Sequence, residues 1–125
     1  KFSICIPNYN YAAYIERAIR SALDQSYRDL EVVVCDNAST DGSVEVVRGI
    51  QDPRLRLKVN ACNVGFAGNL DRAVQLSSGE RIAILSSDDV FRPGMVERYH
   101  ALYSGLAAAA GRDLPVGRAG STARR

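Results

Sequence analysis

The sequence contains few of the residue types that mark metal-bound or disulfide-linked domains. Its 125 residues include no tryptophan, one histidine, one methionine and three cysteines. Cys5, Cys35 and Cys62 are odd in number and none lies in a Cys-x-x-Cys pair, so the pattern favours neither a zinc site nor a disulfide framework. Cys5 and Cys35 lie inside apolar runs, where free cysteine behaves as a small core residue. We therefore expect a reducing, cytoplasmic setting.

Long apolar runs and a concentrated charge of one sign are also missing. No run is long enough to cross a bilayer, so no transmembrane segment is predicted. The net charge is +2, and residues 1–111 carry 12 basic and 13 acidic side chains. Without a basic stripe, the sequence predicts no nucleic-acid partner. The first residue is Lys1 rather than Met, so we expect the chain to begin inside a longer gene product.

The composition is sufficient for one domain. Hydrophobic residues make up 46% of the sequence, enough to bury a core. We predict this domain over residues 1–106. Residues 107–125 begin with four alanines and continue with Gly, Arg, Ser and Pro without periodicity, which predicts a disordered tail.

Short apolar runs alternate with helical patterns along the chain. The runs over 2–6, 30–35 and 81–85 predict buried strands, and a weaker alternation over 55–59 predicts another. Helical spacing covers 14–24, 44–50, 65–76 and 96–106, with Pro93 in the first turn of the last helix. Strands that are apolar on nearly every residue are typical of sheets covered on both faces. We therefore predict an α/β fold with an open, mostly parallel sheet and helices on both faces.

Polar clusters follow three of these strands. In an open α/β sheet, ligands bind beyond the carboxyl ends of the strands. The clusters are Pro7-Asn8-Tyr9-Asn10, Asp36 to Gly42 and Ser86 to Asp89. Together they supply an aromatic face, a carboxylate and a pair of acids, which suit a nucleotide bound through a metal.

The adjacent acids Asp88 and Asp89 favour a cation. Two neighbouring carboxylates repel each other unless positive charge lies between them and a ligand. Mg²⁺ and Mn²⁺ prefer oxygen ligands and commonly combine one or two carboxylates with substrate phosphates. Because neighbouring residues of an extended segment point in opposite directions, we expect only one of the two acids to face the metal.

Five motifs, in order, resemble the nucleotide-binding half of family 2 glycosyltransferases, which have the Rossmann-like GT-A fold. The motifs are Pro7-Asn8-Tyr9-Asn10, Asp36 to Ser43, Asn63-x-Gly65 with Asn69-Leu70, Gly79-Glu80 and Leu85-x-x-Asp88-Asp89. The resemblance covers about residues 2 to 105.

The resemblance implies a role for each matching residue. Tyr9 is implied to stack on the nucleobase, the backbone near Pro7 to contact it, and Asp36 to bind the base or ribose. Asp88 is implied to bind ribose or sugar hydroxyls, and Asp89 to ligate Mn²⁺ or Mg²⁺. The full implied nucleotide-sugar-binding set is Pro7, Tyr9, Asn10, Asp36, Asn37, Asn69 and Asp88. The family often has a second acid where this chain has Asn37.

The implied activity is transfer of a sugar from a UDP- or dTDP-linked donor to an unknown acceptor hydroxyl. An inverting enzyme needs a carboxylate base, which the family carries in the second half of its domain. The only acids after Asp89 are Glu97, on a predicted helix, and Asp113, in the predicted tail. We therefore assign no catalytic residue and expect donor binding without efficient transfer.

Other interpretations of the same residues stay open at this point. Tyr9 packing on Tyr11 or Tyr14 is one, and a solvated turn at Asp88 and Asp89 is another. For the whole chain, the alternative is a non-catalytic nucleotide-binding module or a self-associating one that forms a homodimer through an open sheet edge. A sugar nucleotidyltransferase would want a Gly-rich loop with a basic residue after the first strand, which this sequence lacks.

Overall fold

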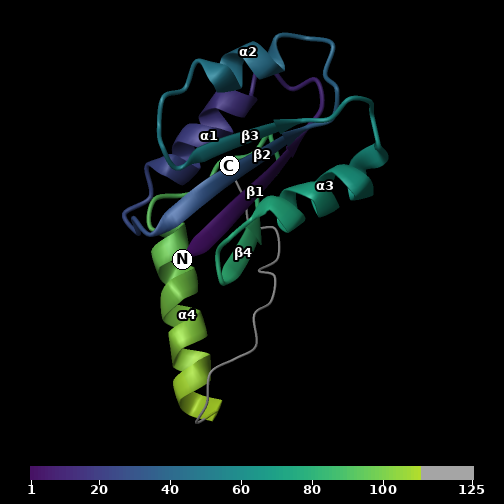
Figure 1. Ribbon diagram of the computed structural model, residues 1–125. Coiled ribbons are helices and arrows are strands. Elements are labelled where there is room, and N and C mark those ends of the chain that lie inside the picture. The colour runs from purple at the N-terminus through teal and green to yellow at the C-terminus, as the bar shows by residue number, and fades with distance from the viewer. Residues whose placement is uncertain (111–125) are drawn as a thin grey trace.

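The computed structural model describes residues 1–110 as one α/β unit (Figure 1). Strands and helices alternate along the chain, and each predicted element is present. The strands are β1 (Phe2–Asn8), β2 (Leu30–Asp36), β3 (Leu55–Val59) and β4 (Arg81–Ile84). The helices are α1 (Ile15–Leu23), α2 (Ser43–Arg48), α3 (Gly65–Leu76) and α4 (Met95–Ala110).

The four strands form one parallel sheet in the order β3-β2-β1-β4. β1 and β2 pair over their whole length, from Phe2 opposite Leu30 to Asn8 opposite Asp36. Parallel neighbours need crossover connections, and the helices supply them. The prediction of an open parallel α/β sheet is confirmed.

Side chains of each strand alternate between two buried faces. Ile4 and Ile6 of β1 pack in a large cluster with residues of α1, α2 and α4, whereas Cys5 packs in a smaller cluster with Ala73 of α3. Figure 1 shows α1 and α2 on one side of the sheet and α3 on the other. Because both faces are covered, the apolar runs of β1 and β2 carry almost no exposed residue.

Two boundaries differ from the prediction. β1 continues through Pro7, because the edge of the strand that holds the Cys5 carbonyl and the Pro7 nitrogen faces β4, which has already ended at Ile84. Pro7 therefore leaves no strand partner unbonded. Gly94 has a left-handed φ of 78°, so α4 begins at Met95 and Pro93 lies outside it.

The far end of α4 also extends beyond the predicted domain boundary. The helix continues to Ala110 and so includes residues 107–110 of the segment predicted as a tail, whereas residues 111–125 of that segment lie outside the described residues. In the part of the chain that the structure describes, no helix is both long and apolar enough to span a membrane.

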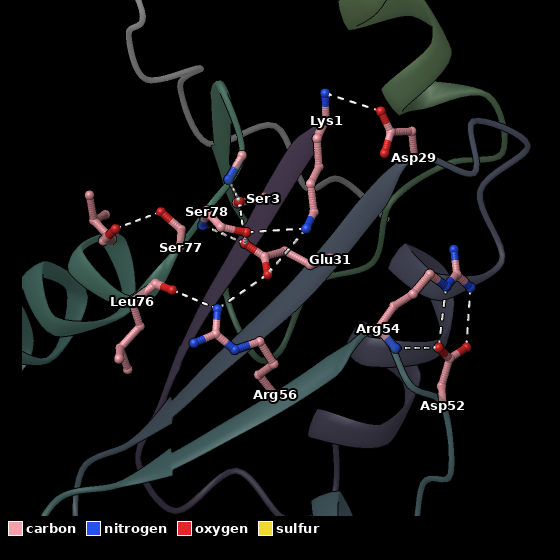
Figure 2. A network of polar contacts seen from close by, with 12 residues as sticks. Lys1, Ser3, Asp29, Glu31, Asp52, Arg54, Arg56, Leu76, Ser77 and Ser78 are labelled. Atoms are coloured by element: carbon pink, nitrogen blue, oxygen red, sulfur yellow. Dashed lines mark hydrogen bonds and ion pairs between the residues drawn. The ribbon is translucent and has the colours of Figure 1, made fainter.

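A buried carboxylate joins three strands and α3 near the amino ends of the strands (Figure 2). Glu31 of β2 is 4% exposed. Its Oε1 accepts hydrogen bonds from the Ser3 hydroxyl at 2.7 Å and from the Ser78 N–H at 2.6 Å, and its Oε2 lies 3.2 Å from Arg56 Nη1. The same Arg56 nitrogen donates to the carbonyl of Leu76 at the end of α3. Glu31 thereby holds the connection between α3 and β4 against the sheet.

Gly79 belongs to the same corner and explains one of the sequence motifs. Its N–H donates to the Ser3 hydroxyl at 2.7 Å, and a Cβ atom added at Gly79 would lie 2.6 Å from that oxygen and 2.8 Å from the carbonyl oxygen of Lys1. Only glycine fits so close to the backbone of β1. The Gly79-Glu80 motif is therefore required by packing at the start of β4.

The Glu31 network makes stability depend on acid pH. Burial by itself raises the pKa of Glu31, but the hydrogen bonds from Ser78, Ser3 and Arg56 outweigh it and lower the pKa from 4.5 to about 2. A carboxyl group with a lowered pKa in the folded state contributes stability above pH 4.5, and this contribution is lost as the pH falls toward 2.

We predict that Glu31→Gln lowers the free energy of unfolding at pH 7 by about 3 kcal/mol and removes most of its change between pH 4.5 and pH 2. Urea unfolding followed by circular dichroism at several pH values measures both effects. Glu16→Gln is the matched control, because Glu16 is 53% exposed and pairs only with Arg20 one helical turn away. Equal pH profiles for wild type and Glu31→Gln would contradict the prediction.

Candidate functional site

A cavity of about 740 Å³ lies at the carboxyl ends of β1, β2 and β4 and at the start of α3. Six of the seven residues predicted to bind a nucleotide sugar line it. They are Pro7, Tyr9, Asn10, Asn37, Asn69 and Asp88. Asp36, the seventh, and Asp89, predicted as the metal ligand, do not line the cavity but follow strands at the same edge of the sheet. The cavity is the leading candidate for a ligand site, because its size suits a nucleotide.

Aromatic side chains stand at the mouth of the cavity. Tyr9 and Tyr11 are each 43% exposed, and Phe66 on the opposite rim is 69% exposed. Tyr11 makes an edge contact with Tyr14, with ring centroids 6.0 Å apart, whereas Tyr9 has no ring partner among the described residues. Tyr9 is thus available to a planar ligand. Tyr11 and Phe66 were not predicted, since exposed aromatic residues carry no periodic signal.

Asn10 holds the loop that presents Tyr9. It adopts a left-handed φ of 57°, which asparagine tolerates better than most residues. Its backbone N–H donates to the Ser39 hydroxyl at 2.9 Å, and its Oδ1 accepts the Thr40 N–H at 2.8 Å. The Ala12 N–H donates to Asp41 Oδ2 at 3.0 Å. The loop after β1 is therefore fastened to the loop after β2.

Asp36 fastens the same two loops from inside. Its side chain is 1% exposed. Oδ1 accepts from Asn8 Nδ2 at 2.8 Å and from the Ser39 hydroxyl at 2.7 Å, while Oδ2 accepts the Ser39 N–H at 2.8 Å. Asn8 itself is 1% exposed, and its Oδ1 has no hydrogen-bond partner among the described residues. The contacts of Asp36 show a positioning role in the loop, and its binding to a base or ribose stays a prediction.

Four asparagine amides form a network along the wall of the cavity beside α3. Asn37 is the centre of this network: its Nδ2 donates to Asn63 Oδ1 at 2.8 Å and to the Gly65 carbonyl at 3.2 Å. Its Oδ1 accepts from Asn60 Nδ2 at 3.1 Å and from the Val64 N–H at 2.9 Å. Each hydrogen-bonding position of the Asn37 amide is therefore used by the protein. The network fixes the 60–65 loop to the end of β2.

Asn60 belongs to this network and was missed by sequence reasoning. It is 3% exposed and follows β3 directly, in the same position in which Asp36 ends β2. A polar residue immediately after a strand is the signal that could have indicated it, but the weak alternation of β3 obscured where that strand ends.

Asp88 and Asp89 lie in the turn that follows β4. The Asp89 N–H donates to the Ser86 carbonyl at 3.0 Å, which closes the turn, and Asp88 lines the cavity. Within residues 1–110, no group of three or more His, Cys, Asp or Glu side chains could hold a metal ion. Two carboxylates and the phosphates of a ligand would still provide the oxygen donors that Mg²⁺ or Mn²⁺ prefers.

Gln25 holds the segment that carries these acids. Its side chain is 1% exposed at the end of α1. Nε2 donates to the Arg92 carbonyl at 2.9 Å and Oε1 accepts the Val96 N–H at 2.9 Å. The neighbouring Ser21 hydroxyl accepts the Phe91 N–H at 2.9 Å. The chain between β4 and α4 is thus fixed to α1 on both sides of Arg92.

Comparison with known proteins assigns the chain to a family. The sequence model of the family "Glycosyl transferase family 2" matches residues 3–110. The chain belongs to glycosyl transferase family 2. A chondroitin synthase of Pasteurella multocida is 42% identical over 97 residues, which are 76% of this chain and 10% of that protein. An uncharacterized glycosyltransferase of Nostoc sp. is 38% identical over 100 residues, 78% of this chain and 31% of that protein.

Solved structures of glycosyltransferases share the fold of this family 2 chain. TarS 1–349 of S. aureus, in complex with UDP-GlcNAc, superposes with a TM-score of 0.79 and 27% identity over 84% of this chain and 31% of that one. The mannosyltransferase PcManGT of Pyrobaculum calidifontis, in complex with GDP-Man and Mn²⁺, gives a TM-score of 0.67 and 35% identity over 72% and 28%. This family 2 chain therefore spans at most 31% of each of these four proteins.

Ala38 gives a stability prediction for the site loop of this family 2 chain. It has a left-handed φ of 61°, a conformation that costs a residue with a Cβ atom about 1 kcal/mol. We predict that Ala38→Gly raises the free energy of unfolding by up to about 1 kcal/mol, because glycine adopts this conformation without that cost.

Denaturant unfolding of Ala38→Gly measures this gain, with Ala38→Val as the matched variant. The branched side chain fits a left-handed φ worse than alanine does, so Ala38→Val should lower the free energy of unfolding. A loss of stability in Ala38→Gly would contradict the prediction.

Proposed function

We propose that this chain is the donor-binding part of a metal-dependent glycosyltransferase and that its cavity binds a nucleotide-diphosphate sugar. The observation that carries the proposal is the shared cavity at the carboxyl ends of the strands, lined by residues from β1, β2, α3 and the turn after β4. Family membership and the nucleotide-sugar complexes of TarS and PcManGT support it. We propose UDP- or dTDP-linked sugars as donors and an acceptor hydroxyl whose identity is unknown.

The proposed roles follow the positions of the side chains. Tyr9 is exposed at the mouth of the cavity and stacks on the nucleobase, which every base permits through its π face. Asp88 lines the cavity and accepts hydrogen bonds from ribose or sugar hydroxyls. Asn69, which is 2% exposed, contributes from the first turns of α3.

A divalent cation fits the turn after β4. Asp89 is the proposed ligand of Mn²⁺ or Mg²⁺, with Asp88 beside it and the diphosphate completing the set of oxygen donors. When bound, such an ion supplies Lewis-acid stabilisation of the negative charge on a departing diphosphate. The Mn²⁺ in the PcManGT complex supports this assignment.

The acids after Asp89 offer no base for the acceptor hydroxyl. Glu97 accepts a hydrogen bond from the Ser26 hydroxyl and does not line the cavity, and Asp113 lies outside the described residues. A base must lie within hydrogen-bonding reach of the proton that it removes. Donor binding without efficient transfer is therefore the activity that we propose for this chain. A cytoplasmic location and a homodimer through an open sheet edge also stay predictions.

Calorimetry tests the metal-assisted site. We expect UDP to bind to the wild-type chain more tightly with Mn²⁺ than without it, and Asp89→Ala to lose this difference because it removes the metal ligand. Glu80→Ala is the matched control, since Glu80 is an exposed acid at the other end of β4. Metal-independent binding in the wild type would favour a non-catalytic nucleotide-binding module, and absence of binding would refute the proposal.

A transfer assay tests the missing base. We expect the 125-residue chain to bind a radiolabelled UDP-sugar and yet to release no labelled product above the background of spontaneous hydrolysis. The reason is that no acid of the described residues both follows Asp89 and lines the cavity. Turnover to a labelled acceptor product would show that this chain supplies its own base or does not need one.

A further inference from the structure

We propose that Asn60 is a positioning residue that sets the hydrogen-bonding polarity of the cavity wall, so that the wall presents N–H groups to a base with carbonyl oxygens, uracil or thymine. The proposal rests on the proposed function and deepens it. Asn60 is 3% exposed, directly follows β3, and donates its backbone N–H to the Asp36 carbonyl at 2.8 Å. Its position is thus fixed from the main chain before its side chain is considered.

The amide of Asn60 has one orientation that satisfies its surroundings. Both Nδ2 hydrogens are used, one toward Asn37 Oδ1 at 3.1 Å and one toward Asn69 Oδ1 at 2.8 Å. Its Oδ1 accepts from Arg72 Nη1 at 3.2 Å. The reversed amide would set its oxygen against two acceptors and its nitrogen against a guanidinium group, which can only donate.

The amides that Asn60 contacts are fixed at their other side by backbone groups that cannot reverse. Asn37 Oδ1 accepts the Val64 N–H at 2.9 Å, and Asn37 Nδ2 donates to the Gly65 carbonyl at 3.2 Å. Asn69 Nδ2 donates to the Cys35 carbonyl at 2.9 Å. The whole network therefore has a single arrangement of donors and acceptors.

This arrangement leaves donors, and no side-chain acceptor of the network, free for a ligand. Asn63 Oδ1 already accepts two hydrogen bonds at 2.8 Å, from Asn37 Nδ2 and from the Gly65 N–H. Both hydrogens of the Asn63 amide nitrogen are unbonded among the described residues, and Asn69 Nδ2 keeps one hydrogen beyond its bond to Cys35. Asn63 and Asn69 both line the cavity.

A wall of N–H groups discriminates between pyrimidine bases. Uracil and thymine carry two carbonyl oxygens, whereas cytosine has an amino group in place of one of them and adenine has no carbonyl. An N–H donor that faces an amino group in a closed site loses its water without gaining a partner. Sites built to hydrogen-bond one group reject an analogue that lacks it far better than apolar sites do.

Titration calorimetry of UDP and CDP with Mn²⁺ tests the proposal, because the two nucleotides differ only in the base. We expect the wild type to prefer UDP, and Asn60→Asp, which keeps the shape and the Arg72 contact but removes two donors, to bind UDP roughly tenfold more weakly. The preference for UDP over CDP should fall toward one. Gln51→Glu is the matched control, since it makes the same amide-to-acid change on an exposed loop and should change neither value.

The ratio of affinities separates positioning from other effects. A carboxylate that acted only through its charge, or a merely structural loss, would weaken UDP and CDP equally, and that result would overturn the proposal. Equal binding of UDP and CDP by the wild type would overturn it while leaving the proposed function in place. No binding of either nucleotide would instead refute the proposed function and this proposal with it.

A second variant covers the case in which Asn60→Asp does not fold. Arg72 is exposed on α3, so Arg72→Met removes the guanidinium that anchors Asn60 Oδ1 without opening the core. We expect a smaller loss of UDP affinity and a narrowed preference over CDP. An unchanged ratio in a folded Arg72→Met chain would overturn the proposal.

Discussion

The buried carboxylate of Asp36 is the constraint on which the candidate site depends. Asp36 and Asn8 end neighbouring strands at the same level of the sheet, and the hydrogen bond between their side chains closes that end. Ser39, bonded to the same carboxylate, brings the loop after β2 back over the loop after β1. Since an unpaired buried charge is costly, these loops keep one relative position. The aromatic mouth and the amide wall of the cavity both follow from that position.

Most of the fold could be predicted from periodicity alone. The three- and four-residue spacing of Ile15, Ala18, Ile19 and Ala22 gave α1, and all four are fully buried. The boundaries were harder, because they depend on neighbours that lie far away in the sequence. Pro7 stays in β1 because β4 stops short of it, and the start of α4 depends on the left-handed backbone of Gly94. Neither condition is visible in a local window of residues.

The site was predictable as a place and less so as a set of contacts. The rule that ligands bind at the carboxyl ends of parallel strands selected the loops correctly, and six predicted residues share one cavity. The sequence could not show that the Asn37 amide is committed to Asn60, Asn63 and the backbone, since these partners lie 23 to 28 residues away. Gln25 was hidden for the same reason, because its acceptor Arg92 is 67 residues distant.

The position of the Glu31 network has a consequence for how such a chain can diverge. Glu31, Ser3 and Gly79 stabilise the sheet near the amino ends of its strands, whereas the cavity lies at the opposite ends. Substitutions that retune the ligand therefore fall on loops that contribute little to the cohesion of that distant corner. An evolving lineage could exchange one donor for another by drift in the loops while the folding free energy supplied by the far end stayed nearly constant.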